Sequence, residues 1–241
     1  MNAYIDRRQR GFSIVELMVA LTISLILMAG VGQIYISTKT SYNLQSGLGR
    51  LQENARSALD ILSHNIGQAG YTDDLSGMDS FNTANTQENQ VENAALGFTQ
   101  ADGTASDTIE VNYKSATDCL GNATGGIATD RYFINGSDLM CLGNGNNTAG
   151  IIAEGVENMQ ILYGEDTDDD GTPNIFVNSG NVSDWNAIKD VRVALLVGTP
   201  DTTGTASIDS STHILLNTRA IGPLNDNMLR RVFTKTILLR N

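Results

Sequence analysis

The sequence has few of the residues from which most enzyme active sites are built. It contains two histidines, His64 and His213, and two cysteines in 241 residues. It has no HExxH zinc sequence, no GxSxG nucleophile sequence, no P-loop, and no GxGxxG sequence ahead of a helical pattern. No spacing of its acidic residues indicates a catalytic pair, so we expect a protein that is not an enzyme.

Positive charge is also scarce over the middle of the chain. Between Asp73 and Asp209 there are 22 acidic residues and four basic ones, and the whole chain carries a net charge of −12. Nucleic-acid-binding proteins need a basic face, so we predict no direct contact with nucleic acid and a solvated acidic surface. Basic residues return only near the C-terminus, at Arg219, Arg230, Arg231, Lys235 and Arg240.

Long apolar runs are absent after Lys39, whereas residues 17–38 contain no charged side chain at all. About 20 apolar residues suffice to span a bilayer as one helix. Three arginines precede the run, at positions 7, 8 and 10, and positive flanks remain in the cytoplasm. The sequence therefore predicts a single membrane span, with the N-terminus in the cytoplasm and the remainder exported.

The start of the apolar run is unusual for a secretory signal peptide. A signal peptide has a shorter apolar core followed by a small-residue cleavage site, but here a glycine, Gly11, comes before the run. Glu16 lies within the first turns, although a carboxylate at the centre of a membrane helix costs roughly 2.5–3.5 kcal/mol. Either Glu16 reaches the membrane surface or another group neutralises it.

Residues 11–16, Gly-Phe-Ser-Ile-Val-Glu, followed by Leu-Met-Val-Ala, resemble the prepilin motif of type IV pilins and type II secretion pseudopilins. The resemblance implies that a prepilin peptidase cleaves after Gly11 and methylates the new N-terminal Phe12. Glu16 is then the fifth residue of the mature chain. In a helical stack, Glu16 of one subunit can meet the Phe12 amino group of its neighbour, which rewards the correct axial stagger.

We expect four parts in the chain: a leader (1–11), the transmembrane and assembly half of one helix (12–38), its amphipathic half (39–70), and a β-rich periplasmic head (71–241). The amphipathic half is predicted from a stripe with helical spacing. The stripe consists of Leu44, Leu48, Leu51, Ala55, Ala58 and Leu62. The fold class is α+β and, by resemblance, type IV pilin-like: a long N-terminal helix packed on an antiparallel sheet.

Strand patterns dominate the head. The alternation of TIEVNY (108–113) is the clearest, and Asn135-Gly136 between two apolar runs predicts a hairpin. Further strands are expected at 156–163, 174–177, 191–198, 212–217 and 231–239. A short helical turn is expected near Trp185.

Cys119 and Cys141 are the only cysteines of an exported head, which favours a disulfide between them. A bridge closing so short a loop contributes about 3 kcal/mol in the chain-entropy model. The alternative is a pair of free, buried thiols.

Residues 166–171 fit D-x-D-x-D-G, the first half of a calcium-binding loop. Asp166, Asp168 and Asp170 would supply carboxylates and Thr172 a backbone carbonyl. The twelfth position is Val177 rather than glutamate, and the alternative is a solvated acidic turn. No cofactor is required by any other pattern, so calcium is the one candidate.

The segment from residue 151 to the end resembles PilW-type minor pilins and, less closely, the J-type pseudopilin of type II secretion. The PilW resemblance implies a minor pilin that primes type IV pilus assembly and supports pilus display, twitching motility, adhesion or DNA uptake. The partners implied are other minor pilins, the major pilin, the prepilin peptidase, the inner-membrane assembly platform and a tip adhesin. The implied final location is the pilus, near its tip.

Two alternatives remain open. One is a minor pseudopilin of a type II secretion system, which neighbouring genes would distinguish from a pilin. The other is a membrane-anchored periplasmic domain that binds a ligand. In that case Glu16 would be replaceable and Gly11 would not be a cleavage site.

Overall fold

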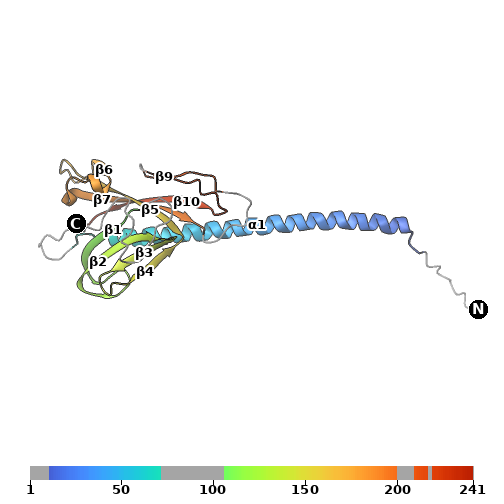
Figure 1. Ribbon diagram of the computed structural model, residues 1–241, viewed down its shortest axis with the longest axis horizontal. Helices are drawn as coiled ribbons and strands as arrows, with labels where there is room; N and C mark the ends of the chain where they lie inside the picture. Colours follow the sequence, from blue (N-terminus) through green and yellow to red (C-terminus); the bar gives the residue numbers. More distant parts are fainter. Residues whose placement is uncertain (1–10, 72–105, 200–208, 217–218, 241) are drawn as a thin grey trace, which may run out of the picture.

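The computed structural model describes residues 11–71, 106–199, 209–216 and 219–240. One helix, α1 (Ile14–Ile66), dominates it; its 53 residues extend about 80 Å at 1.5 Å per residue. The first half of α1 projects away from the rest of the chain, and the second half lies among the strands of the head (Figure 1). Residues 1–10 of the expected leader lie outside the described residues.

Local sequence explains where α1 begins and ends. Ser13 caps the helix, because its hydroxyl accepts a hydrogen bond from the Val15 N–H. Gly67 terminates it, and the N–H of Gly67 still donates to the Ser63 carbonyl. The helix is continuous through four glycines at which helix propensity is weakest. These are Gly30, Gly32, Gly47 and Gly49.

The head contains two four-stranded antiparallel sheets and a small two-stranded sheet. The first sheet has the order β1 (Ile109–Thr117), β2 (Ala123–Asn135), β3 (Asp138–Gly143), β4 (Ala149–Glu154). The second has the order β10 (Arg230–Leu238), β7 (Ile188–Gly198), β5 (Val156–Glu165), β6 (Ile175–Val177). The third pairs β8 (His213–Leu215) with β9 (Arg219–Ile221). Two short 3₁₀ turns, Ser179–Asn181 and Trp185–Ala187, lie between β6 and β7.

The two large sheets are joined beside β5 and wrap the helix between them. The segment just before β1 bonds to β5, because Asp107 N–H donates to the Met159 carbonyl and the Asp107 carboxylate accepts from Ile161 N–H. The outermost strands, β4 and β10, then lie on opposite sides of α1 (Figure 1). Asn54 donates to the Glu154 carbonyl of β4 at 3.0 Å, and Lys235 of β10 donates to Asp60 at 3.1 Å.

The core forms where the second half of α1 meets these sheets. The helix side chains in it are Leu51, Ala55, Ala58, Leu59, Leu62 and Ile66. The predicted stripe is therefore confirmed from Leu51 onward. Leu44 and Leu48 are only half-buried, because they precede the part of α1 that the head covers. The α+β class with antiparallel sheets is confirmed.

Each strand that the sequence predicts overlaps a strand of the structure, and the turn at Trp185 is present. The expected hairpin joins β2 to β3, but Asn135 pairs with Asp138, so Gly136 and Ser137 form the loop. Gly136 has φ of 64°, which only its missing side chain makes easy, as at the first position of a type II′ turn. Strands β4 and β9 were not predicted, because they have only six and three residues and neither shows a regular alternation of apolar and polar side chains.

Arg230, at the start of β10, ties the small sheet to the head. Its guanidinium is almost completely buried and donates to Glu157 of β5, to Asp209 and to Asp226. These bonds hold the pKa of Asp226 below its ordinary value, chiefly through the side-chain hydrogen bond from Arg230. The buried cation is therefore matched by carboxylates from three separate segments.

This cluster predicts an acid-sensitive head. The folded pKa of Asp226 lies below the unfolded value of about 3.9, so its stabilisation is present above about pH 4 and is lost as the pH falls through the folded pKa. We expect Asp226→Asn to lower the melting temperature at pH 7 and to flatten its decline between about pH 4 and pH 2. Thermal unfolding of the full chain in detergent measures both, with the exposed Asp169→Asn as the matched control. The assignment would be contradicted if the melting temperatures of the wild-type and Asp226→Asn proteins declined equally between about pH 4 and pH 2.

Candidate functional site

The candidate assembly site lies at the free end of α1. Gly11 and Phe12 precede the helix, and Phe12 is 84% exposed. Glu16 is exposed in the first turn, where the helix dipole favours an anion. A Cβ added to Gly11 would meet no atom within 4 Å, so the segment is open to an approaching protein. The residues expected to be cleaved, methylated and docked therefore lie together on one accessible stretch.

The helix beyond Glu16 is apolar on every side and is covered by nothing in the described chain. Every residue from 11 to 39 is exposed, although the segment is rich in Leu, Ile, Val and Met. Its length and composition are sufficient to cross a membrane. An apolar surface of this extent marks contact with lipid or with other proteins.

The structure does not bring the three sets of predicted residues together. Gly11, Phe12 and Glu16 belong to the start of α1, whose first half projects away from the head (Figure 1), whereas the cysteines join the turn after β1 to β3 within the head. The acidic loop follows β5 and precedes β6. Each set must therefore act on its own.

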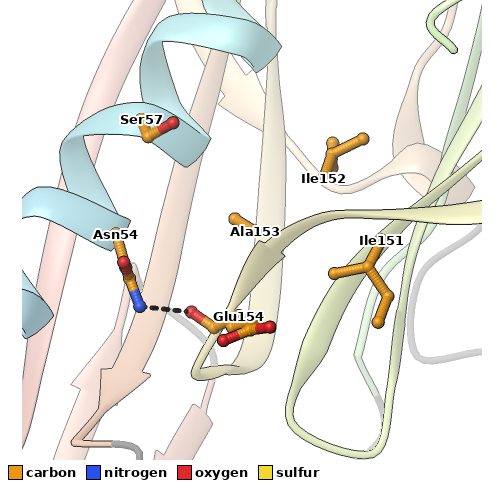
Figure 2. Close-up of a pocket in the computed structure, with 6 residues that line it drawn as sticks. All are labelled: Asn54, Ser57, Ile151, Ile152, Ala153 and Glu154. Atoms are coloured by element: carbon orange, nitrogen blue, oxygen red, sulfur yellow. Dashed lines mark hydrogen bonds between the residues drawn. The ribbon is translucent and has the colours of Figure 1, made fainter.

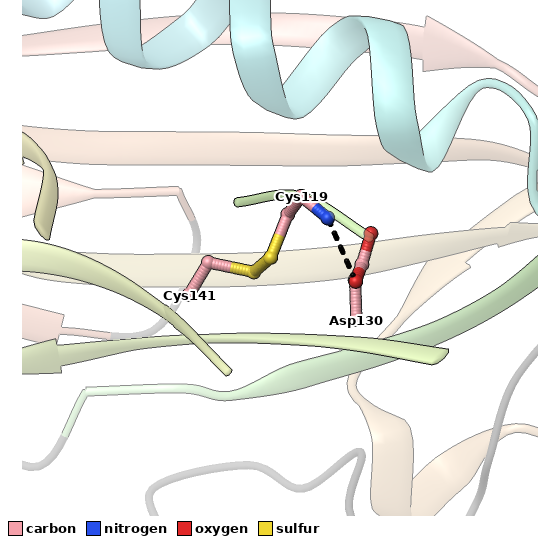
Figure 3. A group of neighbouring side chains, drawn as sticks. All are labelled: Cys119, Asp130 and Cys141. Carbon is pink, nitrogen blue, oxygen red and sulfur yellow. Dashed lines mark hydrogen bonds between the residues drawn. A yellow bond between two sulfur atoms is a disulfide. The ribbon is translucent and has the colours of Figure 1, made fainter. Parts of the chain in front are cut away.

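Cys119 and Cys141 form a disulfide, with 6.6 Å between their Cα atoms. The bridge joins the turn after β1 to the buried face of β3 (Figure 3). Asp130 of β2 lies beside it and accepts hydrogen bonds from the Cys119 N–H at 3.1 Å and from the Tyr113 hydroxyl. Two cysteines and a carboxylate in this arrangement resemble a set of metal ligands, but paired sulfurs offer no thiolate.

Asp130 is the centre of a buried polar network that reaches the helix. Tyr132 bonds to Asp130, and the Asn65 side-chain amide of α1 donates to the Tyr132 hydroxyl at 2.6 Å. Burial raises the pKa of Asp130, and burial together with the bond to Asp130 raises the pKa of Tyr113. The sequence analysis missed this network; its signal was an aspartate two residues from Ala128 and two residues from Tyr132, and therefore on the same face of the strand as both.

The turn that carries Cys119 is organised by Asp118. Its carboxylate accepts from the N–H groups of Leu120, Asn122 and Gly145. Burial would raise the pKa of Asp118, but these bonds outweigh it and hold the pKa below its ordinary value. Gly143 has no room for a side chain, since a Cβ there would lie 2.4 Å from the Asp118 carboxylate. Close packing therefore holds this turn beside the disulfide.

In the acidic loop, one oxygen each of Asp166, Asp168 and Asp170 lies within 4.8 Å of the others. Burial would raise the pKa of Asp166, but backbone N–H groups of the loop, led by Gly171, lower it below its ordinary value. The side chain and N–H of Thr172 both donate to Asp170. The loop is thus shaped in part by its own hydrogen bonds.

Glu165, which precedes the acidic loop, is committed to another segment. Its carboxylate accepts from the Ser183 hydroxyl and from the N–H of Asp184. It therefore does not replace the glutamate that a complete calcium loop has at its twelfth position.

The disulfide predicts a measurable contribution to stability. Replacing Cys119 and Cys141 with alanine should lower the free energy of unfolding by about 3 kcal/mol, because the unfolded chain regains the freedom of the closed loop. Denaturant unfolding of the full chain in detergent measures the difference. A reductant should destabilise the wild-type protein by a similar amount and leave the alanine variant unchanged. Insensitivity of the wild-type protein to reductant would contradict this role.

Comparison with known proteins gives two family matches. A family model described as type IV pilus-assembly protein W matches residues 126–241, and a model of the prokaryotic N-terminal methylation motif matches residues 6–32. Among solved structures, the chain is similar to a type IV-like pilin from Thermus thermophilus. The two share 15% sequence identity with a TM-score of 0.46, over 79% of this chain and 95% of that one. No curated protein matches the chain.

The two family matches cover the two regions where the structure shows a pilin-like plan. The methylation motif covers the exposed start of α1, and the other match begins in β2 and extends through β10. An apolar helix of spanning length and a prepilin motif fit a membrane-anchored pilin, and pilins in general are structural subunits that assemble with other pilins. The chain belongs to the PilW family of type IV pilus minor pilins.

Proposed function

We propose that the protein is a minor pilin that co-assembles with other minor pilins and primes polymerisation of a type IV pilus. The observation that carries this proposal is the start of α1: Phe12 and Glu16, one turn apart, on an apolar helix that no described part of the chain covers. A helix exposed on all sides is stable only among lipids or other helices. The subunit can thus reside in the inner membrane before assembly and then pack among the helices of other pilins.

The proposed assembly step begins with cleavage after Gly11, which frees the amino group of Phe12 for methylation. That amine is a cation at the membrane surface. Glu16 is about 6 Å deeper in the helix at 1.5 Å per residue, so a neighbour displaced by this distance places its amine beside the carboxylate. A misplaced neighbour leaves both charges unpaired in an apolar environment, which is strongly unfavourable. The pair therefore selects the correct stagger.

As such a subunit, the protein would support pilus display, twitching motility, adhesion or DNA uptake. Its partners would be the prepilin peptidase, the inner-membrane assembly platform, the major pilin and a tip adhesin. The periplasm is the proposed location of the head before assembly.

Processing is tested by mass spectrometry of the protein from membranes. We expect a chain that begins at methylated Phe12, and we expect Gly11→Val to retain residues 1–11. Ser13→Ala is the matched control: it removes only the helix cap, worth about 1 kcal/mol, and should still be cleaved. A mature chain that begins at any other residue would overturn the proposal.

Docking is tested with Glu16→Gln, which keeps the size of the side chain and removes its charge. We expect the amount of this variant in sheared surface pili to fall by more than about tenfold. The reason is that the amino group of the neighbouring subunit would be left unpaired, and an unpaired buried charge costs about 3–5 kcal/mol. The amount of Glu16→Gln in membranes should be unchanged. Glu16→Asp keeps the charge and should therefore retain part of the incorporation into pili. Immunoblots of the two fractions measure both. Normal incorporation of Glu16→Gln would remove the proposed role of this residue.

We also propose that the loop at 166–172 binds calcium, because three carboxylates converge there within 4.8 Å. Asp166, Asp168 and Asp170 would supply oxygens and Thr172 a backbone carbonyl, which suits a hard cation. Millimolar calcium should raise the melting temperature by about 2–4 °C for each kcal/mol of binding free energy. We expect Asp168→Asn to abolish the shift and Asp169→Asn, the neighbouring control, to retain it. The absence of a shift in the wild-type protein would refute the site.

A further inference from the structure

Three side chains at the end of the apolar span lie on one face of α1. Tyr35, Lys39 and Tyr42 are separated by four and then three residues, so at 3.6 residues per turn they lie within about 60° of one another around the helix. Tyr35 and Tyr42 are 68% and 70% exposed, and Lys39 is exposed between them. We call these three residues the Tyr-Lys-Tyr stripe.

Lys39 carries the only charge on a long stretch of the helix. No other charged residue occurs between Glu16 and Arg50. The next acid along α1 is Glu53, roughly 21 Å beyond Lys39 at 1.5 Å per residue. Lys39 forms no ion pair with any residue that the structure describes. An anion for this ammonium group would therefore come from outside the described chain.

The span that precedes the stripe can lie in hydrocarbon without an unpaired hydroxyl group. Thr22 and Ser24 are the only polar side chains between Glu16 and Gln33. Thr22 donates to the carbonyl three residues earlier, and Ser24 donates to the carbonyl four residues earlier. Such bonds satisfy hydroxyl groups within the helix, as an apolar environment requires.

The distance between Glu16 and Lys39 matches the thickness of a bilayer. The two residues are about 35 Å apart along the helix at 1.5 Å per residue. A bilayer has roughly 30 Å of hydrocarbon, so both charges can lie just outside it, at opposite surfaces. Tyr35 is then at the boundary of the hydrocarbon, and Tyr42 is about 5 Å beyond Lys39 on the water side.

Each residue type of the stripe suits the layer of phospholipid headgroups. Tyrosine is enriched in this layer because its ring is apolar and its hydroxyl group needs a hydrogen-bond partner. The stem of a lysine lies along apolar surface while its ammonium group reaches water or phosphate. The Cβ atoms of a helix point toward its N-terminus, so the side chains of Lys39 and Tyr42 lean toward the bilayer.

The described head begins well beyond this layer. Leu51 is the first helix residue that it buries, about 18 Å beyond Lys39. Asn54 then donates to the Glu154 carbonyl of β4 at 3.0 Å, and the Glu154 carboxylate projects beside a cavity that α1 and β4 line (Figure 2). Acidic groups are repelled by lipid phosphates. The stripe is therefore better placed than the head to bind the membrane surface.

We propose that the Tyr-Lys-Tyr stripe docks among the phospholipid headgroups of the leaflet nearer the head, with the Lys39 ammonium group on a lipid phosphate. The stripe is continuous with the apolar span, which favours lipid over a protein partner. This contact requires the membrane anchor but not the assembly role proposed above. It fixes the depth of α1 before assembly and holds Glu16 at the opposite surface, where its carboxylate is hydrated.

The lipid contact is tested by solid-state NMR on the full chain in bilayers of phosphatidylcholine and phosphatidylglycerol. The chain has four lysines, and three of them, Lys114, Lys189 and Lys235, belong to strands of the head. With isotope-labelled lysine nitrogen, we expect lipid phosphorus to dephase one Nζ signal, and we expect that signal to be missing in Lys39→Arg. Dephasing of no signal, or of a signal that persists in Lys39→Arg, would overturn the inference.

The depth of the helix is measured in the same bilayers with single cysteines. Because Cys119 and Cys141 are bonded to each other, a cysteine that replaces Ser37 or Gln45 is the one free thiol. We expect a membrane-impermeant maleimide to react at least about tenfold more slowly at position 37 than at position 45, because the stripe holds the edge of the hydrocarbon near the first. Equal rates at the two positions would contradict the proposed depth.

Variants of the stripe show whether it sets this depth. Lys39→Leu removes the charge that stops the helix from sinking, so the maleimide rate at a cysteine replacing Ser41 should fall by about threefold or more; Tyr35→Leu with Tyr42→Leu should act in the same direction. Arg50→Leu, the matched control, removes an equal charge about 16 Å further from the membrane and should leave the rate unchanged. An unchanged rate in either stripe variant, or an equal fall in Arg50→Leu, would overturn the inference.

These measurements require neither cleavage nor pili, so they are independent of the proposed function. A chain that contacts lipid as expected but remains uncleaved in cells would refute the proposed function alone. A chain that is cleaved and enters pili, but shows no lipid contact in bilayers, would refute this contact alone.

Discussion

The structure depends on one constraint: a single helix must be stable in two different environments. From residue 51 onward, one face of α1 is buried by a curved pair of sheets, which remove its apolar stripe from water. Between residues 11 and 39 no face is buried by the described chain. The second half therefore makes the head a folded domain, and the first half makes the protein dependent on lipid or on neighbours.

The head is held to the helix by hydrogen bonds as well as by the packed core. Asn65 begins a buried chain of hydrogen bonds that passes through Tyr132 to Asp130, beside the disulfide. Such a network stabilises only when each member is satisfied, so it fixes the rotation of α1 relative to β2. At the edges, Asn54 and Lys235 fix the same rotation from both sides. Because α1 is held firmly by the head, a contact made by Glu16 can set the axial position of the head.

Charge is distributed along this spine in a way that suits stepwise assembly. The carboxylate of Glu16 is in the apolar half, where an unpaired charge is costly and a matched one is selective. The head is acidic overall, which keeps it soluble, but Arg231 and Lys235 interrupt that field at one edge.

The sequence by itself determined what local pattern controls. Gly11, Phe12, Glu16 and the apolar run are consecutive, and the period of Leu51 to Leu62 fixed the buried face of the helix, because helical geometry repeats every 3.6 residues. Only the tertiary structure decided which distant residues meet. The partner of Asn65 and the buried position of Asp130 depend on how the sheets wrap the helix. The contact of Asn65 with Tyr132 joins residues 67 positions apart, and no short-range period encodes it.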